Sequence, residues 1–160
     1  MAYPTEPTEK GIKDLERWVG DIVSGAEVKL DKYGVAWVDV PLDKLKDTLK
    51  NLKENGYVHI TTITGVDMID ENKIALIYHL APYGISGYPQ LCVKTYVPRD
   101  EPIAPSIVDM FKAALVYERE VYDLLGVKFE GHPNLSRILL PKDLPEGYHP
   151  LRKDFKEEGE

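Results

Sequence analysis

The sequence predicts an α+β fold, in which helices cover a mostly antiparallel sheet of about four to five strands and a long extended tail follows. Three observations lead to this fold class. Apolar residues recur at helical spacing within residues 8–25, 42–55 and 106–126. Short runs rich in β-branched and aromatic residues lie between these segments. After Gly126 both periodicities disappear, although apolar side chains remain frequent.

The first 40 residues predict one helix and one hairpin. An apolar stripe indicates a helix that begins at Thr8 and ends at Gly25, since glycine is a common residue at helix ends. Residues 27–30 and 35–40 read as two strands. The four residues between them, Asp31-Lys32-Tyr33-Gly34, have the composition and length of a hairpin turn.

The middle of the chain predicts a second helix and three more strands. Leucines at positions 42, 45, 49 and 52 form one helical face, and Asn55-Gly56 is a typical helix end. Residues 57–66, 74–80 and 91–97 are the expected strands. Their connections are too short for helical crossovers, so we expect mostly antiparallel pairing.

A third helix completes the predicted body. Ser106 and Asp109 resemble a capping box at its start, and Gly126 stands at its end. With 160 residues, the chain is long enough for one core and short for two. We therefore expect a single domain, with an α+β body at residues 1–126 and an extended partner-binding tail at residues 127–160.

Composition excludes several classes of protein. The chain has 20 basic and 27 acidic residues, a formal charge of -7, which is the wrong sign for a nucleic-acid-binding surface. No apolar run approaches the roughly 20 residues of a membrane-spanning helix, and the first ten residues do not resemble a signal peptide. The one cysteine, Cys92, lies in a predicted strand and is expected to be a small buried apolar residue.

The tail combines an irregular backbone with apolar content. Prolines at 133, 141, 145 and 150 prevent any long regular element there. The segment nevertheless keeps many aliphatic and aromatic side chains, unlike a solvated linker. It could fold back over its own sheet or lie along another subunit. We favour the second, because a proline-rich segment loses less conformational entropy when it becomes ordered on a partner.

Two motifs in this region resemble a known family. The run EREVYDLLGVKFEGHPNLSRILL, residues 118–140, resembles the signature of the thirty-kilodalton subunit family of respiratory complex I. PLRKDF, residues 150–155, resembles the closing motif of that family. The resemblance implies that the motif residues bind a partner or hold the local structure: Glu118, Arg119, Glu120, Asp123, Gly131, His132, Pro133, Arg137, Pro150, Leu151, Arg152, Lys153 and Asp154.

Simple geometry adds expectations about these residues. Arg119 and Asp123 are four residues apart on the predicted helix and could form an ion pair. Glu118 and Glu120 point to other sides, so the three carboxylates do not form a catalytic cluster. Gly131 permits a bend at which the His132 imidazole can bind backbone groups.

By this resemblance, the chain is a non-catalytic structural subunit in the peripheral arm of a membrane-bound, ion-translocating oxidoreductase. The chain itself would bind no cofactor or metal. It would pack against a large catalytic subunit, with a quinone pocket or [NiFe] centre, and a small subunit with an iron–sulfur cluster. These partners would hold it on the cytoplasmic side of the cell membrane and connect it indirectly to the membrane arm.

The type of complex depends on weaker signals. Two residues, Tyr148-His149, separate Gly147 from Pro150, where quinone-linked members commonly have one. Together with the Lys- and Glu-rich composition, this favours a ferredoxin-dependent [NiFe] hydrogenase of archaeal type or its sulfur-reducing relative. The alternative is a subunit of an NADH, F420H2 or ferredoxin:quinone oxidoreductase.

Two readings outside redox complexes stay open. One is a stand-alone enzyme that uses His132, His149 and Asp143 in a cleft. The other is an adaptor whose tail binds an unrelated partner. The chain has no phosphate-binding glycine loop, no nucleophile elbow and no paired cysteines for an iron–sulfur cluster, so we expect it to have no redox centre of its own.

Overall fold

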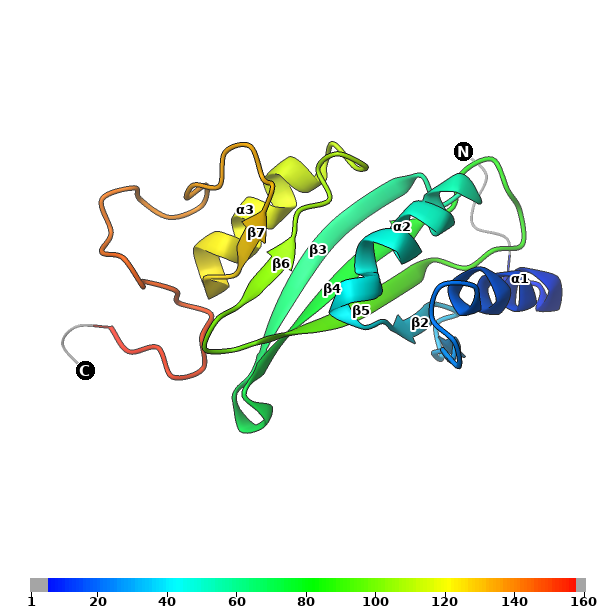
Figure 1. The fold of residues 1–160 in the computed structure, drawn as a ribbon, viewed down its shortest axis with the longest axis horizontal. Coiled ribbons are helices and arrows are strands. Elements are labelled where there is room, and N and C mark those ends of the chain that lie inside the picture. The colour runs from blue at the N-terminus through cyan, green and yellow to red at the C-terminus, as the bar shows by residue number, and fades with distance from the viewer. Residues whose placement is uncertain (1–5, 158–160) are drawn as a thin grey trace. The chain divides into compact units, whose positions relative to one another are not determined.

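The computed structural model describes residues 6–157 and divides the chain into two compact units. The first unit contains the residues up to Thr62 together with Ile77–Thr95, and the second contains Ile63–Leu76 together with the residues from Tyr96 onward. Three long strands, β3 (His59–Met68), β4 (Lys73–Ala81) and β5 (Leu91–Pro98), contribute residues to both units (Figure 1).

The strands form the mixed, mostly antiparallel sheet that the sequence predicts. Its order is β1-β2-β5-β4-β3. β1 (Lys29–Leu30) and β2 (Ala36–Asp39) form the predicted hairpin. β2 also pairs in parallel with β5, with Trp37 opposite Cys92. The α+β fold class is therefore confirmed.

Hydrogen bonds accepted by the side chain of Asp31 explain the hairpin turn. Its Oδ1 accepts the backbone N–H groups of Tyr33 and Val35, at 2.8 and 3.0 Å. Its Oδ2 accepts the indole N–H of Trp37, at 3.0 Å. The Trp37 indole and the backbone of the turn are thus held by one carboxylate.

Helix α1 (Glu9–Gly20) begins where the sequence predicts and ends earlier. The Thr8 hydroxyl accepts the N–H of Gly11 at 3.1 Å, which makes Thr8 the N-cap. The predicted end at Gly25 is wrong, because the helix stops at Gly20 with Asp21 as its C-cap. Gly20 and Asp21 are poor helix formers, and Gly25 lies in the following turn with φ of 78°.

Helix α2 (Leu45–Glu54) follows a short 3₁₀ turn, η1 (Leu42–Lys44). Three leucines of the predicted face, Leu45, Leu49 and Leu52, are fully buried. The helix ends at Asn55, as the sequence predicts. α1 and α2 contact each other in the first unit.

In the second unit, helix α3 (Ala114–Leu125) is shorter than the sequence predicts. The expected start at Ser106 is wrong: residues 106–113 are turns and irregular chain, and the Ser106 hydroxyl donates to Glu118 rather than capping a helix. The predicted end at Gly126 is confirmed, with φ of 80° at that residue. Gly65 of β3 faces the helix, since a Cβ there would lie 2.3 Å from Cδ1 of Leu125.

Two short strands of the second unit are absent from the sequence prediction. β6 (Ile103–Pro105) and β7 (Lys128–Glu130) pair in parallel, with Ala104 opposite Phe129. Three residues are too few to show an alternating pattern. A second 3₁₀ turn, η2 (Ile69–Glu71), joins β3 to β4. Within residues 6–157, no helix has the length and apolar character needed to cross a membrane.

A close backbone contact gives the first prediction. A Cβ on Gly11 would lie 2.2 Å from the carbonyl oxygen of Gly87, which also accepts the Thr8 N–H at 2.8 Å. Gly11→Ala should therefore lower the free energy of unfolding by about 1–3 kcal/mol, because backbone cannot yield as a side-chain end can. Denaturant titration measures this.

Gly20→Ala is the matched control. It replaces a glycine of the same helix, and nothing lies within 4 Å of its Cβ position. The gain in helix propensity should leave stability unchanged or raise it by up to about 1 kcal/mol. Equal losses in both variants would contradict the contact at Gly87.

Candidate functional site

The site is the anchored tail, which we define as residues 127–157, together with the groups that hold it. The centre of its attachment is Asp123 of α3, which is 0% exposed. Asp123 Oδ1 accepts Nη1 of Arg137 at 2.7 Å. Asp123 Oδ2 accepts the backbone N–H groups of residues 138, 139 and 140 at 3.1, 2.9 and 2.9 Å. One carboxylate thus fixes four consecutive residues that belong to no helix or strand.

The electrostatics of Asp123 favour its charged form. Burial alone would oppose ionisation, but the N–H of Leu140 and the Arg137 guanidinium, among other donors, hold the pKa of this carboxyl below its usual value. The carboxylate is therefore charged at neutral pH, and Arg137 compensates the charge. The Arg137 side chain also donates to the carbonyl oxygens of Tyr148 and Pro145, both at 3.1 Å.

Arg119 binds the tail rather than Asp123. Its Nε donates to the carbonyl oxygen of Ser136 at 3.0 Å, and its Nη2 donates to the Ser136 hydroxyl and to the carbonyl oxygen of Arg137 at 3.0 and 2.9 Å. Asp123 pairs with Arg137 instead, as described above. The expected ion pair within the helix is replaced by contacts to the tail, where the Arg119 guanidinium finds three oxygen acceptors.

Glu118 holds the segment before α3. It is fully buried, and its carboxylate accepts the Ser106 hydroxyl and the Ile107 N–H, both at 2.7 Å. Glu118 and Asp123 thus bind different segments: Glu118 binds the residues before α3, and Asp123 binds the tail.

The bend at Gly131-His132 has the expected form. Gly131 has φ of 90°. The His132 Nδ1 accepts the N–H of Asn134 at 3.0 Å, so its Nε2 carries the hydrogen and donates to the carbonyl oxygen of Leu115 at 3.0 Å. The imidazole therefore ties the bend to the start of α3.

The closing motif is held by a second buried carboxylate, Asp67 of β3. It accepts Nε and Nη2 of Arg99 at 2.7 and 3.1 Å, and the backbone N–H of Lys153 at 2.8 Å. Arg99 lowers the pKa of the Asp67 carboxyl. Arg99 also forms an ion pair with Asp154. Arg152 donates to the carbonyl oxygens of Leu125 and Arg99 at 2.7 and 3.0 Å, so it satisfies the end of α3.

His149 fills the space between these two attachments. Its Nδ1 donates to the carbonyl oxygen of Asp123 at 3.0 Å, and its ring meets Tyr122 edge-on at 6.3 Å. Burial lowers the pKa of this imidazole. Gly126 gives it room, since a Cβ there would lie 2.7 Å from Cδ2 and Nε2 of the ring. A glycine is therefore required at position 126 for two reasons: the backbone has a positive φ, and a Cβ would collide with the His149 ring.

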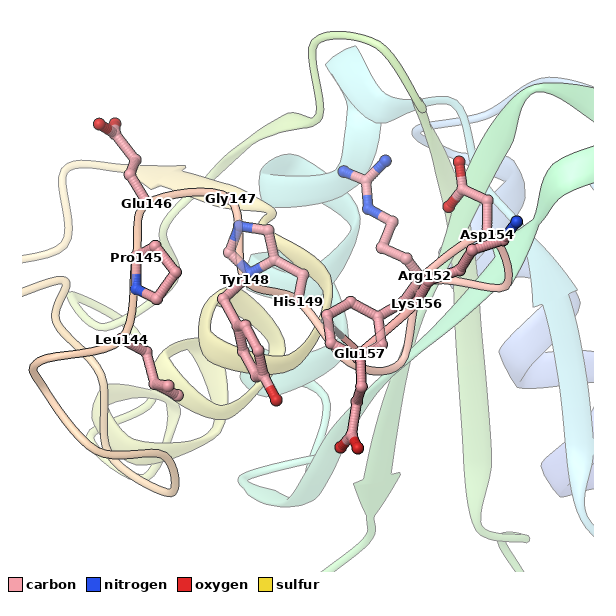
Figure 2. Close-up of a pocket in the computed structure, with 11 residues that line it drawn as sticks. Leu144, Pro145, Glu146, Gly147, Tyr148, His149, Arg152, Asp154, Lys156 and Glu157 are labelled. Atoms are coloured by element: carbon pink, nitrogen blue, oxygen red, sulfur yellow. The ribbon is translucent and has the colours of Figure 1, made fainter. Parts of the chain in front are cut away.

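A shallow hollow of about 880 Å³ lies on the tail itself, lined by residues 144–149, 152 and 154–157. In Figure 2 the His149 imidazole and the Arg152 guanidinium point to one side of the chain and the Tyr148 ring to the other. Tyr148 packs edge-on against Phe155 at 4.8 Å. The walls of the hollow contain no helix or strand.

The residues of the stand-alone enzyme reading are not brought together. His132 binds the carbonyl of Leu115 and His149 that of Asp123, eight residues along α3, or about 12 Å of helix. Asp143 is exposed. Among residues 6–157, no group of three or more His, Cys, Asp or Glu side chains is placed to hold a metal ion.

Sequence reasoning missed Asp67 and Arg99. Asp67 continues the strand pattern of β3 with its side chain only 1% exposed. A lone acidic residue in a strand with no other carboxylate is a usable signal, because a buried charge requires a partner. Arg99 directly follows a predicted strand, and nothing in its neighbours identifies it as that partner.

The family follows from comparison with known proteins. The model of the family described as "Respiratory-chain NADH dehydrogenase, 30 Kd subunit" matches residues 38–160. The chain belongs to this 30 kDa subunit family. The match includes the tail and the strands β3, β4 and β5 of the sheet. It leaves out the first 37 residues, which contain α1 and β1.

Relatives within redox complexes are similar to this chain over most of its length. A subunit of the NADH-quinone oxidoreductase of Moorella thermoacetica is 39% identical over 91% of this chain and 93% of the relative. A subunit of the F(420)H(2) dehydrogenase of Methanosarcina mazei is 37% identical over 76% of this chain and 74% of the relative.

Two solved structures share the fold of this 30 kDa family member. A chain of the archaeal membrane-bound sulfane sulfur reductase has a TM-score of 0.80 at 33% identity and covers 92% of this chain and 86% of its own length. A trypsin-resistant fragment, residues 1–134, of Nqo5 has a TM-score of 0.65 at 29% identity, with 77% of this chain and 97% of the fragment covered.

The attachment at Asp123 gives the second prediction. Asp123→Asn removes the charge that compensates Arg137 and places an amide N–H₂ among donors. We expect a loss of about 3–5 kcal/mol in unfolding free energy, as when one partner of a buried pair is removed. Asp143→Asn, an exposed site on the same tail, should change stability by less than about 0.5 kcal/mol. Similar losses in both variants would contradict the role of Asp123.

Two glycines with nearly equal φ angles give the third prediction. Gly126 and Gly147 have φ of 80° and 83°, but only at Gly126 does a Cβ meet another group, His149. Gly147→Ala should cost about 1 kcal/mol from backbone strain alone. Gly126→Ala should cost about 1–3 kcal/mol more, because the His149 ring must move. Thermal unfolding of the two variants measures both losses of stability, and their difference gives the cost of the contact between the new Cβ and His149. Equal losses would show that this contact costs nothing.

Proposed function

We propose that this chain is the 30 kDa-type subunit of a complex I-like, quinone-linked dehydrogenase in the membrane. The observation that carries the proposal is the 39% identity over nearly the full length of a subunit of an NADH-quinone oxidoreductase. The F(420)H(2) dehydrogenase relative also supports a dehydrogenase. The relatives therefore favour a quinone-linked complex over the [NiFe] hydrogenase that Tyr148-His149 and the composition indicate.

A sulfur-reducing complex is the second candidate. The chain from the membrane-bound sulfane sulfur reductase has the higher TM-score of the two structures, 0.80, and includes most of this chain's length. Both candidates assign the same role to the chain. It is a non-catalytic structural subunit in the peripheral arm, held on the cytoplasmic side of the membrane by its partners.

In this role the chemistry belongs to other subunits. The expected partners are a large catalytic subunit and a small subunit with an iron–sulfur cluster, and the cofactors lie in those partners. The side chains of this chain that are buried and charged, Asp67, Glu118 and Asp123, are all bound to donors of the same chain. Their contacts support a structural use of the motifs.

The docking surface, on this proposal, is apolar and lies on the anchored tail. Glu118, Arg119, Asp123, Arg137 and Arg152 form contacts within the chain, so they position the tail. The side chains left for a partner include Leu139 and Leu151, which are 57% and 55% exposed. Asp123 fixes the backbone at Leu139, and the Leu151 N–H bonds the carbonyl of Leu124 at 3.0 Å. Both leucines are thus presented from a fixed backbone.

The division into a body at 1–126 and a tail at 127–160 is part of this proposal. The trypsin-resistant fragment of Nqo5 supports it, because a piece of that relative that matches 77% of this chain withstands digestion. The tail still contributes to its own unit, since Val127 and Phe129 are buried. Truncation after Gly126 would remove these core residues, so point substitutions on the surface are the sharper test.

Co-purification tests the docking surface and gives the fourth prediction. Leu139→Asp and Leu151→Asp should each weaken association with the other subunits by about 30-fold or more, the effect of losing a central apolar contact. Tyr33→Asp, at a residue that is 78% exposed in the first unit, is the control and should co-purify normally. Circular dichroism of each variant checks that the fold is kept.

Retention of the complex in both leucine variants would refute the docking surface. The identity of the captured partners tests the class of complex. A quinone-reducing assembly with an NADH or F420H2 module supports the main proposal, and sulfur-reducing activity supports the second candidate. Nickel in the captured partner would restore the hydrogenase reading, and no redox partner at all would favour an adaptor.

A further inference from the structure

The end of helix α3 depends on donors from outside the helix. The last four carbonyl groups of any helix have no partner within it, and in α3 they belong to residues 122–125. The carbonyl of Tyr122 accepts the N–H of Gly126 at 2.8 Å. Asp123 and Leu125 are 0% and 2% exposed, so little water reaches them. The other three carbonyls therefore require donors from the protein.

The closing segment, which we define as residues 149–154, supplies these donors. The carbonyls of residues 123, 124 and 125 accept, in this order, the Nδ1–H of His149 at 3.0 Å, the backbone N–H of Leu151 at 3.0 Å and the Nε–H of Arg152 at 2.7 Å. The two side chains among these donors extend to the same side of the tail (Figure 2). The guanidinium also places a positive charge at the negative end of the helix dipole. The closing segment is thus the cap of α3.

Asp123, which anchors the earlier part of the tail, lies in this capped turn. Its carboxylate accepts Nη1 of Arg137 and the N–H groups of residues 138–140. A helix end that loses its donors frays, because its last carbonyl groups then turn to water. The position of the Asp123 carboxylate therefore depends on the cap. The backbone at Leu139 depends in turn on that carboxylate.

We propose that the closing segment positions the docking surface, with Arg152 as the main positioning residue. By capping α3, Arg152 holds Asp123, and Asp123 holds the backbone at Leu139. Leu151 belongs to the closing segment itself. A partner therefore meets both exposed leucines as one apolar surface rather than as two independent contacts. This inference rests on the proposed function, which assigns both leucines to the contact with a partner.

Arg152 is chosen because its side chain joins the cap to a third part of the chain. Its Nη1 donates to the carbonyl oxygen of Arg99 at 3.0 Å. Arg99 is itself held by the buried carboxylate of Asp67 in β3, at 2.7 Å. A methionine at position 152 keeps an unbranched stem and loses every donor. A lysine keeps the charge and one donor group but not the fork of the guanidinium.

Hydrogen exchange of the full-length chain, followed by NMR, tests the link. The amides of residues 138–140 report the anchor, because each is bound to Asp123 Oδ2. In Arg152→Met their protection factors should fall by about tenfold or more, and Arg152→Lys should restore part of the loss. The Ile107 amide is the internal reference. It is bound to Glu118, in the first half of α3, at 2.7 Å, and should stay protected in both variants.

Lys156→Met is the matched control variant. It makes the same kind of change, from a cation to methionine, at an exposed site four residues after Arg152. Among the residues that the structure describes, none forms a hydrogen bond or ion pair with the Lys156 side chain. Protection at residues 138–140 should equal that of the wild-type chain. A loss as large as in Arg152→Met would make the effect one of net charge and overturn the positioning role.

Two further exchange results would overturn the inference. Unchanged protection of residues 138–140 in Arg152→Met would show that the end of α3 needs no cap from the closing segment. An equal loss at Ile107 would show that Arg152 supports the whole unit rather than the anchor.

Co-purification separates this inference from the proposed function. Arg152→Met should weaken association with the other subunits by about 30-fold or more, as Leu139→Asp does. Loss of association with full protection at residues 138–140 would show that Arg152 contacts the partner itself, and would overturn its positioning role. Loss of protection with normal association would confirm the link from Arg152 to Asp123 and refute the docking surface.

Discussion

The tail of this protein depends on the buried carboxylate of Asp123. Residues 131–157 contain no helix or strand, so their backbone groups lack the regular partners that a ladder or a helix would supply. Asp123 supplies an acceptor for three of them and for Arg137. A single charged side chain can do this because it has two oxygens with about four acceptor sites. Asp123 therefore holds the N–H side of residues 138–140, while Arg119 holds the carbonyl oxygens of Ser136 and Arg137.

The same solution occurs three times in the second unit. Glu118 accepts from Ser106 and Ile107, Asp67 accepts from Arg99 and Lys153, and Asp123 accepts from the tail. Each carboxylate loses its hydration on burial, and at Asp67 and Asp123 an arginine and backbone N–H groups together offset that cost. Glu118 is held by a hydroxyl and a backbone N–H. The buried carboxylates thus hold in one conformation the irregular segments that no helix or strand would fix.

The predictability of each part follows from the range of the forces that form it. The leucine face of α2 and the glycine at the end of α3 are predictable from the sequence, because both are local patterns. The predicted start of α3 is wrong, because Ser106 bonds Glu118, a residue twelve positions away. The parallel β6–β7 pair and the Asp67–Arg99 ion pair depend on contacts distant in sequence, and no local pattern records them.

A motif residue can act in two ways: it can contact a partner directly, or it can position the tail that contacts the partner. A charged signature suggests contacts across an interface, because charges are expected at surfaces. In this chain Asp123 and Glu118 are fully buried, and Arg119 donates to three acceptors of the tail. A substitution at such a position would change the tail before any partner meets it. Loss of assembly in an Asp123 variant is therefore not evidence that Asp123 contacts a partner. Loss of assembly in a Leu139 variant that keeps its fold is evidence of direct contact, because Leu139 is exposed.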